Sequence, residues 1–441
     1  MLTPEEILEM AGDGRVKFLR LQFTDTFGTL KNIAVTSEDL GRALAGQIAF
    51  DGSVVDGLVN HHEQDIVLRP DPATFALFPW RPREGAVVRV ICDVANPDGT
   101  PYPGCSRSIL KQVLEEATRM GLEIRVGAEV EFYLFHTDSK GNPTTDSHDS
   151  AGFCDLTPVD LGENARRDMV LTMEEMGFDI GSSHHEAGPG QHGIALKPDY
   201  ALSTADKLIT FKFIVRTIAQ RHGLYASLMP MPLNGMPGSA LRLQLILGRA
   251  DVGSFSDTGR PLRLSPETGH FIAGVLSQAR ANTAITNPLI NSYKRLVSGG
   301  RAPLYAAWSE DSRVSMLRVV EHSARETRVE IRSPDPACNP YLALAVILKA
   351  GIKGIREKIS LPPPLAENNP QNGGHRRQSE IAPCLPRTLE EALRELDSDQ
   401  AGRAVLGDHI YQLFTRAKAG EWERFQAFVH PWELKEYLSY F

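Results

Sequence analysis

The chain has 441 residues, which is too many for one ordinary hydrophobic core, so we expect two domains. Apolar residues at 42% and charged residues at 23% are usual for a globular protein in water, and the net charge is −8. Because no basic cluster could follow a nucleic-acid groove, the sequence argues against nucleic acid as a partner.

Cysteine usage and the N-terminus both favour a cytoplasmic protein. The 5 cysteines are scattered without CxxC spacing, so neither a disulfide framework nor a zinc site is predicted. The acidic stretch 1–6 lacks the features of a signal peptide, and no apolar run is long enough to span a bilayer. We therefore expect no membrane association.

The N-terminal part predicts a small α+β unit. Residues 16–23 alternate apolar and polar side chains, a turn follows at 25–28, and a second extended stretch comes next, which together predict a β-hairpin. The loop at 96–101 (NPDGTP) predicts a domain boundary. We place the two domains at 1–103 and 104–441.

Three stretches of the second domain alternate with the period of a β-strand: 128–135, 241–247 and 328–332. Since successive side chains of a strand point to opposite faces, each strand carries polar groups on one face and a core on the other. The polar faces carry Glu129 and Glu131, Arg242 and Gln244, and Arg328, Glu330 and Arg332. These patterns predict an α+β fold whose curved, mostly antiparallel sheet lines a polar cavity.

Two later segments have clear local signals. Asn339-Pro340 predicts the start of a helix whose apolar run 341–348 should be buried. The segment 368–379 (NNPQNGGHRRQS) is polar and predicts a surface loop, to which no role is assigned.

Taken singly, the candidate site residues leave their chemistry open. Glu129 and Glu131 lie about 7 Å apart by strand geometry and could hold Mg²⁺ or Mn²⁺, although a solvated sheet face fits equally well. His184-His185-Glu186 is not HExxH, and alone it favours a polar loop over a metal site. No GxxxxGK[ST] motif occurs, so any nucleotide is bound without a P-loop.

Four arginines lie in segments that we expect to be ordered: Arg295, Arg313, Arg318 and Arg332. Guanidinium groups suit the recognition of carboxylates and phosphates by paired hydrogen bonds. Structural ion pairs explain any one of them equally well.

Together these segments resemble type I glutamine synthetase over nearly the whole chain, in its shorter subtype without an adenylylation insert. The resemblance is carried, in order, by Asp51-Gly52-Ser53, Pro70-Asp71-Pro72, 128–132 (AEVEF), His184-His185-Glu186, 291–296 (NSYKRL), 330–336 (EIRSPDP) and 430–433 (HPWE). It implies a small N-terminal β-grasp domain and a larger catalytic-type α/β domain.

In that family, ATP phosphorylates the γ-carboxylate of glutamate, and ammonia then displaces the phosphate. The resemblance implies ATP and Mg²⁺ or Mn²⁺ as cofactors, a glutamate-like or nucleotide ligand, and a homo-oligomer, namely a dodecamer of two hexameric rings. It assigns Glu131 and Glu186 to one metal, and Glu129 and Glu330 to the other. It assigns the binding of glutamate and the transferring phosphoryl group to Arg295, Arg313, Arg318 and Arg332. Gly238 and Ser239 are assigned to the nucleotide, and Asp51 to ammonium across a subunit boundary.

Three departures from the family pattern predict a degenerate site. Gly193 stands where the family has a metal-binding Glu, Arg242 replaces a metal-binding His, and Arg301 replaces the Glu of an ammonium-guarding flap. Together these exchanges add 4 positive charges, the charge of two divalent cations. Because buried carboxylates need compensating partners, we expect Arg242 and Arg301 to replace the metals electrostatically and metal binding to be weak or absent.

Two hypotheses about function follow. The first is a glutamine synthetase-like protein with impaired or lost glutamate–ammonia ligation that acts as a regulatory, ligand-binding or assembly subunit, because an arginine cannot supply the Lewis-acid and bridging roles of a metal. The second is a working ATP-dependent glutamate–ammonia or glutamate–amine ligase that acts through a γ-glutamyl phosphate.

Overall fold

The computed structural model describes residues 4–13, 15–58, 65–82, 84–249, 253–254, 259, 262, 264–298, 302–323, 326–365 and 382–441. Two sequence predictions concern residues outside these ranges, namely Arg301 at the flap position and the polar segment 368–379.

The N-terminal unit is built on a six-stranded sheet in the order β2-β1-β6-β4-β3, with β5 beside β6. The predicted hairpin is confirmed, because β1 and β2 pair antiparallel on either side of the turn at 25–28. Buried side chains from β1 and β6, such as Leu19, Leu21 and Val90, form the core of this unit. Its elements are α1 (Pro4–Gly12), β1 (Val16–Thr24), β2 (Leu30–Thr36), α2 (Leu40–Leu44), β3 (Ile48–Asp51), β4 (Asp65–Pro70), β5 (Ala76–Leu77) and β6 (Ala86–Ala95).

The rest of the chain forms a ten-stranded sheet in the order β14-β15-β16-β12-β7-β10-β9, with β8 and β11 also paired to β7 and β13 paired to β12. Among the described pairings of this sheet only β14–β15 is parallel, so the predicted mostly antiparallel sheet is confirmed. The strands are β7 (Glu123–Thr137), β8 (Pro143–Ser147), β9 (Ile180–His185), β10 (Gln191–Tyr200), β11 (Leu224–Ser227), β12 (Leu241–Arg249), β13 (Gly253–Ser254), β14 (Tyr305–Ser309), β15 (Ser315–Ser323) and β16 (Glu326–Ile331).

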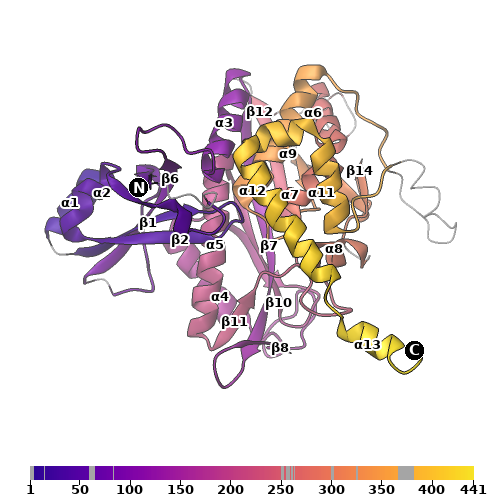
Figure 1. The fold of residues 1–441 in the computed structure, drawn as a ribbon, viewed down its shortest axis with the longest axis horizontal. Coiled ribbons are helices and arrows are strands. Elements are labelled where there is room, and N and C mark those ends of the chain that lie inside the picture. Colours follow the sequence, from indigo (N-terminus) through magenta and orange to yellow (C-terminus); the bar gives the residue numbers. More distant parts are fainter. Residues whose placement is uncertain are drawn as a thin grey trace.

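Helices cover the apolar face of this sheet, and further helices pack on them (Figure 1). The helix α5 packs on β7 and β10, and α9 packs on α5 in turn. The predicted burial of the run 341–348 in α9 is confirmed, since every one of its side chains is at most 1% exposed. The helices are α3 (Ser106–Arg119), α4 (Glu163–Glu175), α5 (Ala201–Arg221), α6 (Pro266–Ser277), α7 (Ala279–Thr286), α8 (Ile290–Val297), α9 (Pro340–Glu357), α11 (Leu389–Ser398), α12 (Gln400–Gln426) and α13 (Pro431–Tyr437).

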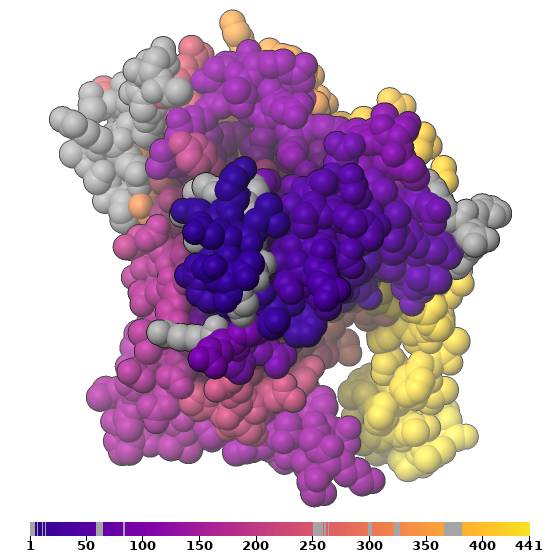
Figure 2. Space-filling view, turned by 90° about the vertical axis from the view of Figure 1, so that its left-hand side faces the viewer, coloured from indigo at the N-terminus to yellow at the C-terminus, as the bar shows by residue number. Residues whose placement is uncertain are grey.

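A buried arginine joins the two parts of the molecule. The guanidinium of Arg107, on α3, contacts Asp71 at 2.6 Å and Asp93 at 2.9 Å in the N-terminal unit, and Asp206 of α5 at 2.9 Å. Figure 2 looks onto the N-terminal unit, which covers the middle of that face of the molecule. Since Arg107 is buried, its three carboxylate partners fix how the two parts meet.

The start of α9 makes a second junction with the N-terminal unit. The Asn339 side chain caps the helix by accepting from the backbone N–H of Tyr341, and it donates to the carbonyls of Asp25 and Thr26. Gly28, at φ +83°, lies so close that an added Cβ would stand 2.9 Å from the Cα of Asn339. Only glycine therefore fits the hairpin turn against this helix.

The C-terminal helix α13 projects from the body of the molecule (Figure 1). Aromatic side chains in and around it are largely exposed, with Trp432 at 60% and Tyr440 at 81%. In the described part of the chain, no helix combines the length and the apolar character needed to cross a membrane.

Candidate functional site

Two antiparallel neighbours of β7, namely β12 and β10, and the strand β16 beyond β12 bring the candidate site residues together on the polar face of the sheet. β12 places Arg242 opposite Glu129, and β10 places Gly193 opposite Glu131. β16 places Glu330 one strand further along, opposite Gln244. The metal-binding roles assigned to these acids by resemblance stay predictions, but the side chains do share one site.

Arg242 lies between the two carboxylates of β7. Its Nη2 is 2.6 Å from Oε1 of Glu131, and its Nη1 is 3.1 Å from Oε2 of Glu129. Burial raises the pKa of Glu131, and the nearby guanidinium of Arg242 opposes that rise. Burial alone would lower the pKa of Arg242. The surrounding carboxylates outweigh this effect and raise the pKa above its usual value, so the side chain stays charged.

His184 reaches the same site from β9. Its Nε2 lies 3.0 Å from Oε1 of Glu186 and 3.6 Å from Oε1 of Glu129. The hydrogen bond with Glu186 raises the pKa of His184. Gly193 gives His184 this room, because an added Cβ there would stand 3.1 Å from Oε1 of Glu186 and 3.2 Å from Nε2 of His184.

These donors fit one divalent cation. Glu129, His184 and Glu186 each offer a ligand atom, and these atoms lie within 4.8 Å of one another. Two carboxylate oxygens and an imidazole nitrogen are suitable ligands for Mn²⁺ and, less well, for Mg²⁺. A second cation beside Glu131 does not fit while Arg242 holds that carboxylate. The prediction that metal binding is weak or absent is therefore not supported at the cluster of Glu129, His184 and Glu186, which combines one acid from each of the two predicted metal positions.

The site opens into a cavity of about 910 Å³. Among the residues assigned by resemblance, those lining it are Glu131, Glu186, Gly238, Arg242, Arg295 and Arg332. Arg295 is 3% exposed and donates to the backbone carbonyls of Ser333 and Arg332 at 2.8 and 2.9 Å. An added Cβ at Gly238 would stand 2.8 Å from Cγ of Arg295, so this position also favours glycine.

Other predicted site residues lie outside the cavity lining. Glu330 contacts Arg332, with Oε1 and Nε 3.4 Å apart, while Arg313 and Arg318 are exposed. Ser239 is buried and its Oγ has no hydrogen-bond partner in the described structure. Asp51 lies on β3 of the N-terminal unit, where its carboxylate accepts from the Ser53 N–H at 2.9 Å. Its expected role in the site of another subunit stays a prediction.

Sequence reasoning missed three residues of the site. His184 was noted only as part of a triplet, and Lys294 and Trp432 line the cavity without having been singled out. All three lie inside segments quoted for the family resemblance. Those segments were therefore the signal that could have identified them.

A second group of acids and histidines lies behind this site: Asp149, Asp160, His185 and His192. Arg166 donates to Nδ1 of His192 at 2.8 Å and to Asp160 at 2.7 Å. A guanidinium can only donate, so His192 carries its proton on Nε2, which cannot then bind a metal. We interpret this group as a structural network of paired charges.

Known proteins match this chain over both of its parts. Residues 15–97 match the family described as the β-grasp domain of glutamine synthetase, and residues 103–437 match its catalytic domain. The glutamine synthetase of Clostridium saccharobutylicum is 46% identical over 437 residues, covering 99% of each chain. That of Methanosarcina mazei is 43% identical over 437 residues, covering 99% of this chain and 98% of the other.

Solved structures are similar over almost the whole chain. The GmaS/ADP complex superposes with a TM-score of 0.87 at 28% identity, covering 98% of this chain and 99% of that one. A cryo-EM structure of Plasmodium falciparum glutamine synthetase gives 0.88 at 22% identity, covering 99% of each chain. The second likeness concerns the fold alone.

Proposed function

This chain belongs to the glutamine synthetase family, and from that premise we propose that it is an ATP-dependent ligase that joins an amine to a glutamate-like acid. The reaction would pass through a γ-glutamyl phosphate, in a site remade around one divalent cation and Arg242. The cluster of Glu129, His184 and Glu186 beside the cavity is the observation that carries this proposal. Full-length relatives named glutamine synthetase, and a structural neighbour solved with ADP, support the choice of a nucleotide-using ligase.

Each charged group has a distinct task in this proposal. A divalent cation held by Glu129, His184 and Glu186 would neutralise phosphate oxygens when bound. Arg242 supplies a fixed positive charge where the family uses a second cation. Arg295 and Arg332 line the cavity at positions suited to a substrate carboxylate and the transferring phosphoryl group. Gly238, which lines the cavity, is proposed to contact the nucleotide, whereas Ser239 is buried outside the lining and its contact with the nucleotide stays a prediction.

We also propose that the acceptor is an amine other than ammonia. The family uses a flap glutamate to attract ammonium, and this chain has Arg301 at that position, which lies outside the described residues. A positive charge there would repel ammonium, so glutamine formation should be slow. A larger amine that binds through its apolar part does not depend on that glutamate.

A second candidate is favoured by Arg242 itself. Since its guanidinium contacts both Glu129 and Glu131, the site is satisfied electrostatically without a second cation. A protein with this arrangement could bind a carboxylate or a nucleotide and turn nothing over. It would then act as a regulatory or assembly subunit.

One experiment separates the two candidates. ATP hydrolysis is measured with glutamate, Mg²⁺ or Mn²⁺, and either ammonia or one of a panel of primary amines. Mn²⁺ binding is followed by electron paramagnetic resonance and ADP binding by calorimetric titration. Amine-dependent turnover, absent in Glu129→Gln, supports the ligase. Binding of Mn²⁺ and ADP without turnover supports the second candidate, and binding of neither excludes both.

We propose that the chain forms a homo-oligomer, as family resemblance implies. Its support here is the exposed apolar surface of the C-terminal segment, where Leu438 is 74% exposed and Trp432 60% exposed. Mass photometry of the full chain and of a variant lacking residues 428–441 tests this, because the variant should form smaller assemblies. The dodecamer, the domain boundary after residue 103 and the cytoplasmic location likewise stay predictions.

A further inference from the structure

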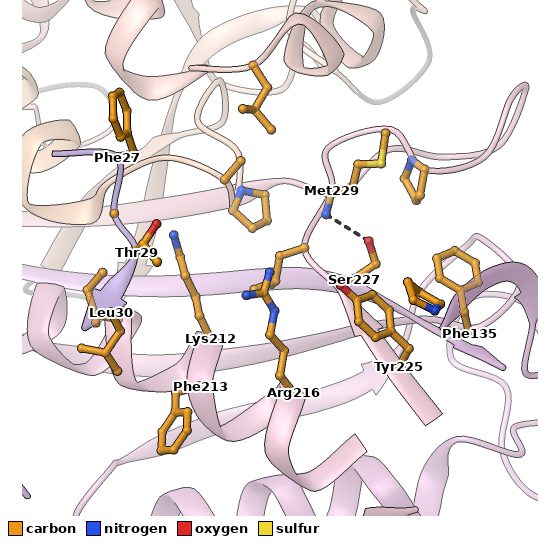
Figure 3. A pocket seen from close by; sticks show the side chains of 18 of the residues that line it. Phe27, Thr29, Leu30, Phe135, Lys212, Phe213, Arg216, Tyr225, Ser227 and Met229 are labelled. Atoms are coloured by element: carbon orange, nitrogen blue, oxygen red, sulfur yellow. Dashed lines mark hydrogen bonds between the residues drawn. The ribbon is translucent and has the colours of Figure 1, made fainter. Parts of the chain in front are cut away.

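A second cavity, of about 1010 Å³, lies between the N-terminal unit and the larger domain and is separate from the carboxylate cluster. The hairpin of β1 and β2 forms one side of it, α5 forms the floor, and β11 with the end of β7 forms the other side (Figure 3). Its lining shares Met229 and Pro232 with the cavity of the candidate active site. Nothing in the proposed ligase reaction uses this space.

The lining of the cavity is positively charged, although Asp335 and Asp25 lie close enough behind it to act on Lys212. Its lining includes Arg20, Lys212 and Arg216, and none of the lining residues is Asp or Glu. Lys212 and Arg216 stand one helical turn apart on α5 and both point into the cavity (Figure 3). Such a surface attracts anions, and two neighbouring cations suit a doubly charged group better than a single carboxylate.

The two cations on α5 keep donors available for a ligand. Nζ of Lys212 donates to the carbonyl of Cys338 at 2.6 Å, which uses one of its three hydrogens. Arg216 is exposed and forms no ion pair among the described residues. Burial lowers the pKa of Lys212, and an anion beside it would oppose this effect.

Aromatic rings flank the cations. Tyr225 and Phe135 lie together at one end of the cavity, on the far side of Arg216 from Lys212 (Figure 3). Their strands are paired, with Tyr225 directly opposite Phe135. A flat ring could pack against this end while a charged group attached to it reaches α5.

We propose that this cavity binds a small organic phosphate with an aromatic ring, its phosphate between Lys212 and Arg216 and its ring against Tyr225 and Phe135. This proposal does not rest on the proposed ligase activity, since none of these four residues belongs to the carboxylate cluster. Each part of the ligand contributes, so an aromatic phosphate binds more tightly than either of its parts.

The test is isothermal titration of the full chain with phenyl phosphate, inorganic phosphate and phenol at low ionic strength. Phenyl phosphate should bind most tightly, and Arg216→Glu should weaken it by about tenfold or more, because a charge-assisted hydrogen bond is lost and repulsion replaces it. Arg119→Glu makes the same charge change at an exposed helical position outside the cavity and should leave the affinity unchanged. Tyr225→Leu should weaken phenyl phosphate while leaving inorganic phosphate unaffected.

Three results would overturn the proposal. The first is no binding of phenyl phosphate at millimolar concentration. The second is equal affinity in the wild type and Arg216→Glu, which would locate the ligand elsewhere. The third is that Arg216→Glu changes the assembly state but not the affinity for phenyl phosphate, which would make the cavity a contact between copies of the chain.

Discussion

The guanidinium of Arg242 lies against the carboxylate of Glu131, with Nη2 and Oε1 2.6 Å apart, at a position where the family resemblance expects a metal ion. Glu131 also accepts from the N–H of Ala240 at 2.8 Å, so both of its oxygens have partners. Because both oxygens are already paired, the Glu131 carboxylate is a poor ligand for a cation. Replacing the guanidinium should therefore change the metal chemistry of the site.

Arg242→His is expected to raise the affinity for Mn²⁺ by about tenfold or more, since it frees two carboxylates and adds an imidazole ligand. The measurement is Mn²⁺ titration followed by electron paramagnetic resonance. Arg125→His, an exposed exchange on the same sheet, serves as the control. An Mn²⁺ affinity that stays the same in Arg242→His would refute electrostatic replacement of the metal by this arginine.

Gly193→Glu alone should bring less improvement than Gly193→Glu combined with Arg242→His and Arg301→Glu. A side chain at position 193 crowds Glu186 and His184, so His184 must move before the new carboxylate can act as a ligand.

His184→Asn should lower the affinity for Mn²⁺ by about tenfold relative to the wild type, because a ligand is lost. Calorimetric titration of the four proteins with Mn²⁺ tests both statements, and an unaltered affinity in His184→Asn would exclude this imidazole as a ligand.

Arg107→Met should lower the free energy of unfolding by about 3 to 5 kcal/mol, because it leaves Asp71, Asp93 and Asp206 without their shared partner at the domain junction. Urea denaturation followed by tryptophan fluorescence measures the loss. Arg119→Met on the exposed side of the same helix is the control and should change little. A loss below about 1 kcal/mol would mean that this junction does not depend on the ion pairs.

Asp149→Asn should destabilise the protein most at pH 5 and least at pH 3. Although burial raises it, hydrogen bonds from His185 and Gly190 lower the pKa of Asp149 below its usual 3.8. Stability from a lowered carboxyl pKa is present above the unfolded value and is lost as the pH falls through the folded one. Unfolding of both proteins at the two pH values checks this, and an equal difference at both would contradict it.

Much of the fold could be predicted because local patterns determine it. Alternation places Glu129 and Glu131 on one face of β7, and the apolar run after Asn339 predicts a buried helix. The contact of Arg242 with both acids could not be predicted from the strands alone, because it depends on the register between β12 and β7. The reach of His184 to Glu186 depends likewise on the open space above Gly193 in the neighbouring strand.

Met229 and Pro232 line both cavities, so they form a partition between two compartments, the candidate active-site cavity and the cationic cavity on α5. The N–H of the adjoining Met231 donates to the Asn291 side chain at 2.7 Å, and the Asn291 amide donates to the Met231 carbonyl at 3.0 Å, which connects the segment to α8. Any molecule that shifts this partition from one compartment alters the affinity of the other. Thermodynamic reciprocity then requires the second occupant to act back on the first by the same factor.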